Sequence, residues 1–441
     1  MIIEFRLGNY KSFKDIGVFS LIASNDNKHV DKNIISFKFP YSSREKEIRL
    51  LKSAVIYGAN ASGKSNLLNA LKFMQSFVFN SSKNTQITED IPIERCLVSS
   101  KSENMPSHFE LTFIHQNILY RYGFEVTDKE ITSEWLFSSP KGREALLFVR
   151  DNNLIEIGDS FKEGRGLEDK TRNNALFLSV CAQFNGETSA SIIKWFRSFN
   201  VISGIEDKSY LQYTLNKLED KEFYCEIEKF IHIADLGIEE LKFEQRDVNF
   251  EDLDEEIKNH ILGMNDVRKF IKSNIDYKKE INIKTVEDRF NFLHSKYNDE
   301  NKKIGNVPFK MDQESQGTQK LFAVAGPIID TLKNGKTIFI DELDTRLHPL
   351  LTQFIIHLFN SNETNKKGSQ LIFATHDTNL LSSRFFRRDQ IWFIEKNKYN
   401  VSDIYSLSDY RVRKDATFNK DYIMGKYGAI PYINSDNLFE E

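Results

Sequence analysis

Residues 58–65 read Gly-Ala-Asn-Ala-Ser-Gly-Lys-Ser and match the pattern G-x-x-x-x-G-K-[ST]. The glycines let backbone N–H groups approach an anion, Lys64 reaches the β and γ oxygens of a triphosphate, and the Ser65 hydroxyl binds Mg²⁺. Residues 51–57 predict a buried strand before the loop, and residues 66–74 have helical spacing after it, so a helix N-terminus faces the anion. The predicted phosphate-binding residues are Gly58, Asn60, Ala61, Ser62, Gly63, Lys64, Ser65 and Asn66.

A second segment ends in two adjacent carboxylates. The β-branched and aromatic residues 337–340 predict a strand buried on both faces of a parallel sheet, and Asp341 and Glu342 follow it directly. Such sheets bind ligands at the carboxyl ends of their strands. We therefore expect Asp341 to hold the Mg²⁺ shell together with Ser65, and Glu342 to orient or deprotonate an attacking water.

A third apolar segment, residues 370–374, predicts another buried strand, and it leads into Thr375 and His376. A histidine at that strand end, beside the expected γ-phosphate, can donate a hydrogen bond to it as a charged or neutral imidazole. The expected catalytic side chains are therefore Lys64, Glu342 and His376.

The order of these segments resembles the ABC-type ATPase head shared by SMC and RecF-like proteins. Residues 314–321, Glu-Ser-Gln-Gly-Thr-Gln-Lys-Leu, look like a degenerate form of the family's L-S-G-G-Q signature that keeps Ser315 and Gly317. Ser315 also suits the cap of a helix whose N–H groups bind a phosphate. The resemblance implies that the chain binds ATP and Mg²⁺ and hydrolyses ATP.

In this family the signature of one subunit closes over the nucleotide of another, which implies a head-to-tail homodimer, or a higher homo-oligomer, with composite ATP sites. Asp344, two residues after Glu342, matches the aspartate of the family's D-loop at that interface. His348 and Pro349 follow as in RecF-like and OLD-like branches, and they equally suit a turn that opens the next helix.

The resemblance also implies a glutamine that senses Mg²⁺ and the γ-phosphate. Gln183 ends the apolar segment 177–184, which reads as a strand just before the insertion, where the family places this residue. Gln116 is the alternative, although it lies in what reads as a hairpin turn between strands at 109–114 and 118–126. We therefore favour Gln183 as the ligand of ATP and Mg²⁺.

Residues near both ends of the chain resemble particular branches of this family. Residues 5–13 are similar to the first strand of RecF-like heads, and residues 420–431 look like the tail of bacterial AAA-type ATP-binding proteins of abortive-infection and restriction-associated systems. Such relatives act in phage defence beside a small effector, which implies control of a separate nuclease or toxin. The short stretch after Asp377 suggests an OLD-like ATPase without the nuclease domain.

Composition limits the partners. The 441 residues carry 60 Lys and Arg against 64 Asp and Glu, a net charge of −4, so contact with nucleic acid would require a local basic patch. Three scattered cysteines and the lack of a run of about 18 apolar residues favour a reducing, cytoplasmic location without a membrane. DNA contact is left open; the candidate residues are Arg384, Arg387, Arg388, Arg411, Arg413 and Lys414.

The predicted fold class is α/β: an ABC-type ATPase head with a mixed sheet around the phosphate loop, an antiparallel β lobe and a helical insertion. Residues 1–190 form the first lobe, residues 301–441 form the second lobe, and residues 191–300 form the insertion. Within the insertion, helices are expected over 211–230 and 251–270, with too few heptads for SMC-type coiled-coil arms.

The favoured function is an ATP-hydrolysing, dimerising switch that senses or scaffolds in anti-phage defence. A RecF-like DNA-binding repair or recombination ATPase and a scaffold that binds ATP without hydrolysing it are the alternatives. An ABC transporter motor is least favoured because the sequence shows no membrane segment and the insertion separates Ser315 from Lys64 by 315 − 64 = 251 residues. Its partner would have to be an integral membrane protein.

Overall fold

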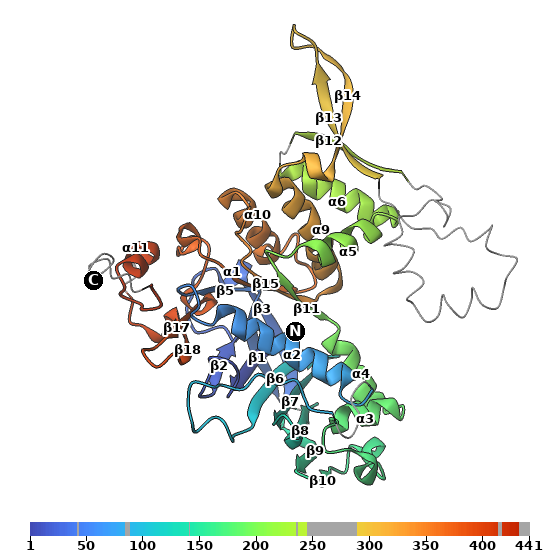
Figure 1. Ribbon diagram of the computed structural model, residues 1–441, viewed down its shortest axis with the longest axis vertical. Coiled ribbons are helices and arrows are strands. Elements are labelled where there is room, and N and C mark those ends of the chain that lie inside the picture. The colour runs from blue at the N-terminus through green and yellow to red at the C-terminus, as the bar shows by residue number, and fades with distance from the viewer. Residues whose placement is uncertain are drawn as a thin grey trace, which may run out of the picture. The chain divides into compact units, whose positions relative to one another are not determined.

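The structure is a computed structural model that describes residues 1–41, 44–83, 89–140, 142–234, 237–244, 289–412 and 417–431 (Figure 1). The chain divides into two compact units, Met1–Asp207 with Pro327–Glu441, and Lys208–Gly326. The predicted boundaries at 190 and 300 stay a prediction. The helix expected over 251–270 lies outside the described residues.

One sheet of the first unit carries the predicted phosphate loop. Its strands are β5 (Ser53–Tyr57), β11 (Phe199–Ser203), β15 (Thr337–Asp341), β16 (Gln370–Ala374), β17 (Ile391–Lys396) and β18 (Ser402–Ser406). They lie in the order β11-β15-β16-β5-β17-β18, and every neighbouring pair is parallel except β17 with β18. All residues of β5 and β16 are buried, as expected for apolar strands covered on both faces. The carboxyl ends of β5, β16 and β15 therefore meet at one edge of the sheet.

A second sheet of this unit is antiparallel. It consists of β1 (Ile2–Gly8), β2 (Gly17–Ser20), β6 (Ser107–His115), β7 (Ile118–Val126), β8 (Ile131–Ser139), β9 (Ala145–Asp151) and β10 (Leu154–Ile157). The order is β10-β9-β8-β7-β6-β1-β2. Gln116 and Asn117 join β6 to β7 with φ of 47° and 63°, the left-handed backbone that a two-residue hairpin requires. The predicted hairpin is confirmed. A separate hairpin pairs β3 (Ile34–Tyr41) with β4 (Arg44–Leu51).

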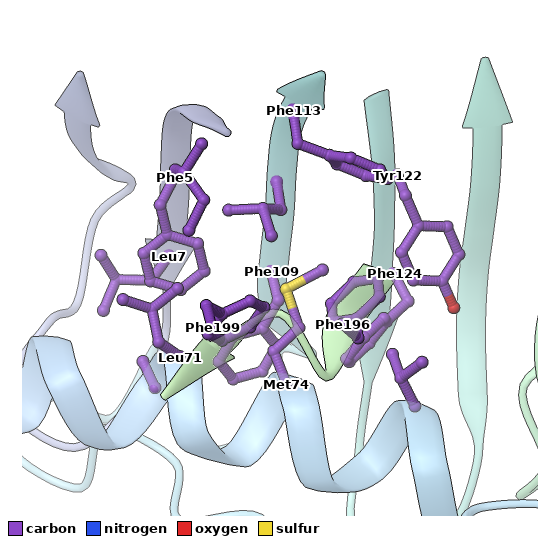
Figure 2. Close-up of a cluster of buried hydrophobic side chains, with 14 of the residues drawn as sticks. Phe5, Leu7, Leu71, Met74, Phe109, Phe113, Tyr122, Phe124, Phe196 and Phe199 are labelled. Carbon is purple, nitrogen blue, oxygen red and sulfur yellow. The ribbon is translucent and has the colours of Figure 1, made fainter. Parts of the chain in front are cut away.

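Helix α2 (Lys64–Asn80) begins at the phosphate loop and packs against the antiparallel sheet. Figure 2 shows strand residues such as Phe5, Phe109 and Phe124 gathered with Leu71 and Met74 of the helix in one apolar layer. All five side chains are buried. Burial of this face fixes the helix, and with it the loop, on the β lobe.

Among the described residues, the first unit also contains α1 (Val30–Asn33), α3 (Phe177–Gln183), α4 (Glu187–Phe196), α10 (Pro349–Asn360), α11 (Phe418–Ile423) and the second part of α9 (Gln316–Asn334). His348 is the N-cap of α10, with its ring nitrogen accepting from Leu350 N at 3.3 Å. The second unit holds α5 (Lys208–Lys217), α6 (Lys221–Ile233), an antiparallel sheet of β12 (Ile238–Glu244), β13 (Arg289–Tyr297) and β14 (Lys303–Lys310), and the first part of α9 (Gln316–Asn334).

The predicted fold class is confirmed, with two local corrections. Residues 177–183 are helical, because the buried carboxylate of Glu134 accepts hydrogen bonds from Phe177 N at 2.6 Å and Leu178 N at 3.0 Å and so caps the helix start. The region 191–300 is not wholly helical: β11 belongs to the parallel sheet, and β12 and β13 pair with each other. Helical spacing around 211–230 does correspond to α5 and α6.

Replacement of Phe109 by Ala should destabilise the first unit strongly. The ring is fully buried and its centroid lies 5.1 Å from that of Phe73 and 5.5 Å from that of Phe124. We expect a loss of about 3–5 kcal/mol, measured as a lower urea midpoint. Leu154→Ala, at a side chain that is 79% exposed, is the control and should change stability by less than about 0.5 kcal/mol. Equal midpoints for the two variants would contradict the packing described.

Candidate nucleotide-binding site

The predicted phosphate loop joins the carboxyl end of β5 to the first residue of α2. Gly63 stands immediately before the helix with φ 116°, and Ala61 has φ 60°. The loop therefore turns the backbone so that the free N–H groups of the first helical turn lie at the loop, which is the arrangement that binds anions.

Both glycines of the pattern are required by their surroundings. A Cβ on Gly58 would lie 2.3 Å from the Ile394 carbonyl oxygen and 2.5 Å from Ser62 Oγ. A Cβ on Gly63 would lie 2.6 Å from Ser402 Oγ and 2.9 Å from Ser12 Oγ, and φ at this residue is one that L side chains rarely adopt. The loop thus has room only for glycine at these positions.

Two serines that were not predicted from the sequence, Ser12 and Ser402, support the phosphate loop. Ser402 Oγ donates towards Ser62 O at 2.5 Å and lies 2.7 Å from Ser12 Oγ, which in turn accepts from Asn66 Nδ2 at 2.7 Å. Ser402 and Ser12 are almost fully buried. Isolated serines carry no sequence signal of this kind, because the contact joins residues 390 positions apart.

Lys64 is 6% exposed and folds back over the loop, where Nζ donates to Gly58 O at 2.8 Å and to Ala59 O at 3.1 Å. Burial lowers the pKa of Lys64, and the carboxylates of Asp341, Glu342 and Asp344 oppose that shift. The Lys64 ammonium group therefore interacts electrostatically with the acidic residues at and after the end of β15.

The acid pair lies where β15 leaves the sheet. Asp341 is the last residue of the strand, and Leu343 N donates to Ala374 O of β16 at 3.2 Å, which holds the following turn against the neighbouring strand. Glu342 has φ 52°, and its Oε2 accepts from Thr345 Oγ1 at 3.1 Å.

The surroundings of Asp341 fit a Mg²⁺ ligand. Burial raises the pKa of this carboxyl, Glu342 raises it further, and the Ser65 hydroxyl and Lys64 lower it. Its Oδ1 is buried and has no hydrogen-bond partner among the described residues. In that part of the chain no cluster of three or more His, Cys, Asp or Glu is placed to hold a metal by itself. A Mg²⁺ ion held by one or two protein oxygens and by phosphate oxygens needs no such cluster.

His376 follows β16, whose end is joined to the phosphate-loop strand by Thr375 N donating to Ile56 O at 3.2 Å. Burial and then Lys64 lower the pKa of His376 below 6.5, whereas Asp344, Glu342 and Asp341 raise it. At pH 7 the imidazole is therefore mainly neutral and can donate from one nitrogen.

The assignment of Gln183 is wrong in this structure. Its Nε2 donates to Ser82 O at 3.3 Å, beyond the carboxyl end of α2, whereas Ser65 lies in the first turn. A helix of 17 residues separates the two by about 25 Å. The error follows from the predicted strand at 177–184.

Gln116 lies at the end of the β lobe that faces away from the phosphate loop. In the pairing of β6 with β1, His108 lies opposite Gly8 at the end towards the loop, and Phe113 lies opposite Ile2 at the other end, where Gln116 follows. The strand beside Asp341 is instead β11, whose Ser203 is its register partner. The sequence signal available for this strand was weak, since Asn200 interrupts the apolar residues Phe199, Val201 and Ile202 before Ser203 and Gly204.

Ser315 and Gly317 belong to the second unit, and Lys64 to the first. Ser315 Oγ accepts from Thr318 N at 3.1 Å at the start of α9, as expected for a cap. The role of both residues towards a phosphate stays a prediction. Asp344 lies in the turn after β15, and its buried Oδ1 has no hydrogen-bond partner within the described ranges.

Two of the arginines that were candidates for DNA contact form ion pairs within the chain. Arg387 is fully buried and pairs with Asp389 at 2.7 Å, so its side chain is structural. Arg388 pairs with Asp26 at 3.4 Å. Arg384 and Arg411 are exposed, and residues 413 and 414 lie outside the described residues.

Helices long and apolar enough to cross a bilayer are absent from the described ranges.

Gly63→Ala should weaken nucleotide binding, because the added Cβ displaces Ser402 and Ser12 and strains the turn into α2. We expect the Kd for ATP to rise at least about 10-fold in a titration with fluorescent nucleotide. Gly166→Ala is the matched control, since Gly166 also has positive φ (79°) but no atom within 4 Å of the new Cβ. Unchanged affinity in Gly63→Ala would show that the loop does not bind the phosphates.

The chain is similar to one protein family and to several solved structures. A family model described as "AAA domain, putative AbiEii toxin, Type IV TA system" matches residues 53–382. Similar solved structures include the SMC head domain from Thermotoga maritima, with 13% identity, a TM-score of 0.39 and coverage of 92% of this chain and 98% of that chain. Another is an SmcHead bound to the C-winged helix domain of ScpA, with 13% identity, a TM-score of 0.41 and coverage of 92% and 97%. No curated protein matches the chain.

The family model covers more than half of the chain and includes the phosphate loop, the acid pair and His376. It confirms the predicted AAA-type ATPase class, whereas the OLD-like and anti-phage details stay predictions. The chain belongs to the family of AAA domains described as putative AbiEii toxins of type IV toxin–antitoxin systems.

Proposed function

We propose that this chain is a Mg²⁺-dependent ATPase whose subunits dimerise head to tail around ATP. One observation carries the proposal: the parallel register of β15, β16 and β5 brings the acid pair, His376 and buried Lys64 to the same edge of the sheet. A nucleotide-binding AAA domain supports the binding of ATP, and the proposed step beyond it is hydrolysis.

Each residue of the site has a separate proposed role in hydrolysis. When bound, ATP with Mg²⁺ supplies the phosphoryl group that is transferred to water. Ser65 and Asp341 would hold the ion, and Lys64 would exchange the carbonyls of Gly58 and Ala59 for phosphate oxygens. Glu342 orients the attacking water and takes its proton, and neutral His376 donates a hydrogen bond to the γ-phosphate.

The second half of each site would come from a facing subunit. Ser315 caps the start of α9, and with Gly317 it leaves N–H groups at a helix end that favours an anion. Asp344, in the turn after Glu342, would lie at the interface. A closed dimer therefore would contain two ATP sites, each built from two chains.

The role proposed for this ATPase is that of a cytoplasmic sensor or scaffold that controls a separate effector, a nuclease or toxin, in anti-phage defence. Support comes from the family's description, which names a type IV toxin–antitoxin system and hence more than one component. A DNA-binding repair ATPase is less well supported because Arg387 and Arg388 are engaged within the chain.

Mixing two inactive variants tests the composite site. Lys64→Ala should lose ATP binding and hydrolysis. Ser315→Arg should bind ATP, but its dimer should not close and ATP should not be hydrolysed. An equimolar mixture contains dimers in which one intact loop faces one intact helix tip, so we expect it to regain up to about a quarter of the parental rate in a phosphate-release assay. Mixtures no more active than their components would contradict the head-to-tail arrangement, and a parental rate near zero would favour the non-hydrolysing scaffold.

Glu342→Gln should bind ATP with parental affinity, stop turnover and trap the closed dimer. The amide keeps the shape of the side chain but cannot accept the proton of the attacking water. Light scattering with and without ATP measures the dimer, and phosphate release measures turnover. Hydrolysis at the parental rate would show that another residue activates the water.

A further inference from the structure

The turn that carries the acid pair is held in an unfavourable backbone conformation. Glu342 has φ 52° and Arg346, four residues later, has φ 63°, values uncommon for residues other than glycine and asparagine. Backbone strain of this kind persists only where the surroundings impose it. The contacts around residues 341–347 show what imposes it here.

One support comes from β16. Leu343 N donates to Ala374 O at 3.2 Å, and inside the turn Thr345 N donates to Glu342 O at 3.3 Å and Leu347 N to Asp344 O. These bonds fix the inner side of the turn. They do not reach Arg346, which lies on the opposite side.

The other support comes from the residues that follow β11. Gly204 N donates to Asp341 O at 2.6 Å, and a Cβ on Gly204 would lie 2.1 Å from Glu342 O. The backbone after β11 is therefore in direct contact with the backbone of the acid pair. Only glycine allows this approach.

Arg346 completes the second support. Its Nη2 donates to Asp207 Oδ2 at 3.0 Å and to Ile205 O at 3.0 Å. The pair is half-buried, with 25% of the Arg346 side chain and 22% of the Asp207 side chain exposed, so solvent screens it less than a surface ion pair. Arg346 thus ties the far end of the turn to the same segment that Gly204 ties to its start.

We propose that Arg346 and Asp207 are positioning residues for hydrolysis, which hold Glu342 in its strained conformation by fastening the turn 341–347 to the segment 204–207. The inference rests on the proposed function for its activity readout. Neither side chain has a contact with the phosphate loop among the interactions of the described residues, so the pair acts on turnover and leaves ATP binding intact.

The test compares Arg346→Ala, Asp207→Ala and the exchange of both residues, Arg346→Asp with Asp207→Arg. Each single variant should lower kcat roughly 10-fold or more, since small displacements of a catalytic group have effects of this size, while Kd for ATP stays within about twofold. The exchange restores an opposite-charge pair, and Asp tolerates positive φ, so it should recover much of the lost rate. Arg165→Ala, which removes the exposed Arg165–Asp159 pair, is the control and should match the parent.

A second measurement does not depend on hydrolysis. Hydrogen exchange of a peptide that covers residues 341–347, without nucleotide, should be faster in both single variants and close to the parental rate in the exchange variant. If the parental chain does not hydrolyse ATP but exchange is faster in the single variants, Arg346 and Asp207 hold the turn 341–347 as proposed, and the proposed ATPase activity is wrong.

If the parental chain hydrolyses ATP, the proposal requires both the loss of kcat and the faster exchange. Parental kcat or parental exchange in Asp207→Ala would overturn it. A loss of kcat in Arg346→Ala that neither Asp207→Ala reproduces nor the exchange repairs would also overturn it, because Arg346 would then act directly, for example on the nucleotide of a facing subunit.

Discussion

The parallel alignment of β5, β16 and β15 is the constraint on which the rest of the site depends. Each strand is short and apolar, and hydrogen bonds to its neighbour place its carboxyl end at the same edge of the sheet. Because of this register, one lysine, one histidine and the acidic residues from distant parts of the chain come within electrostatic reach of one another. The shifts in pKa of Lys64, Asp341 and His376 express that proximity together with their burial.

Buried aromatic side chains support the edge of the sheet at which Lys64, the acid pair and His376 lie. Helix α2 begins in the phosphate loop and buries its apolar face on the β lobe, where Phe109 and Phe124 pack against it (Figure 2). Ser12 and Ser402 then contact the loop from the other side. The loop is therefore shaped by its surroundings before any nucleotide arrives, which reduces the ordering cost of binding.

The turn 341–347, which carries the acid pair, is also held in place by contacts with its surroundings. Its backbone is strained at Glu342 and at Arg346, and it is fastened to β16 on one side and to the residues after β11 on the other. Loops carry functional residues because a rigid scaffold can position them. Here the scaffold includes an ion pair, Arg346 with Asp207, which joins the turn to the segment after β11.

Sequence alone predicted the phosphate loop and the strands that lead into the acid pair and His376, because each depends on residues adjacent in the chain. The order of these segments predicted the fold class. Local spacing also predicted the β6–β7 hairpin and the helices at 211–230. Local spacing failed at Gln183, since an apolar run of this length fits a strand or a helix. The carboxylate that caps the helix belongs to Glu134, 43 residues before Phe177, and local spacing does not reveal it.

Tertiary structure decided which residues surround the site. Ser203 lies beside Asp341 because β11 pairs with β15, and Asp207 meets Arg346 across 139 positions of sequence. Contacts of this kind leave no periodicity or motif, because they arise from strand order and from packing after the chain has folded. The chemistry of the phosphate loop is therefore encoded locally, whereas the position of the acid pair relative to it is set by the whole sheet.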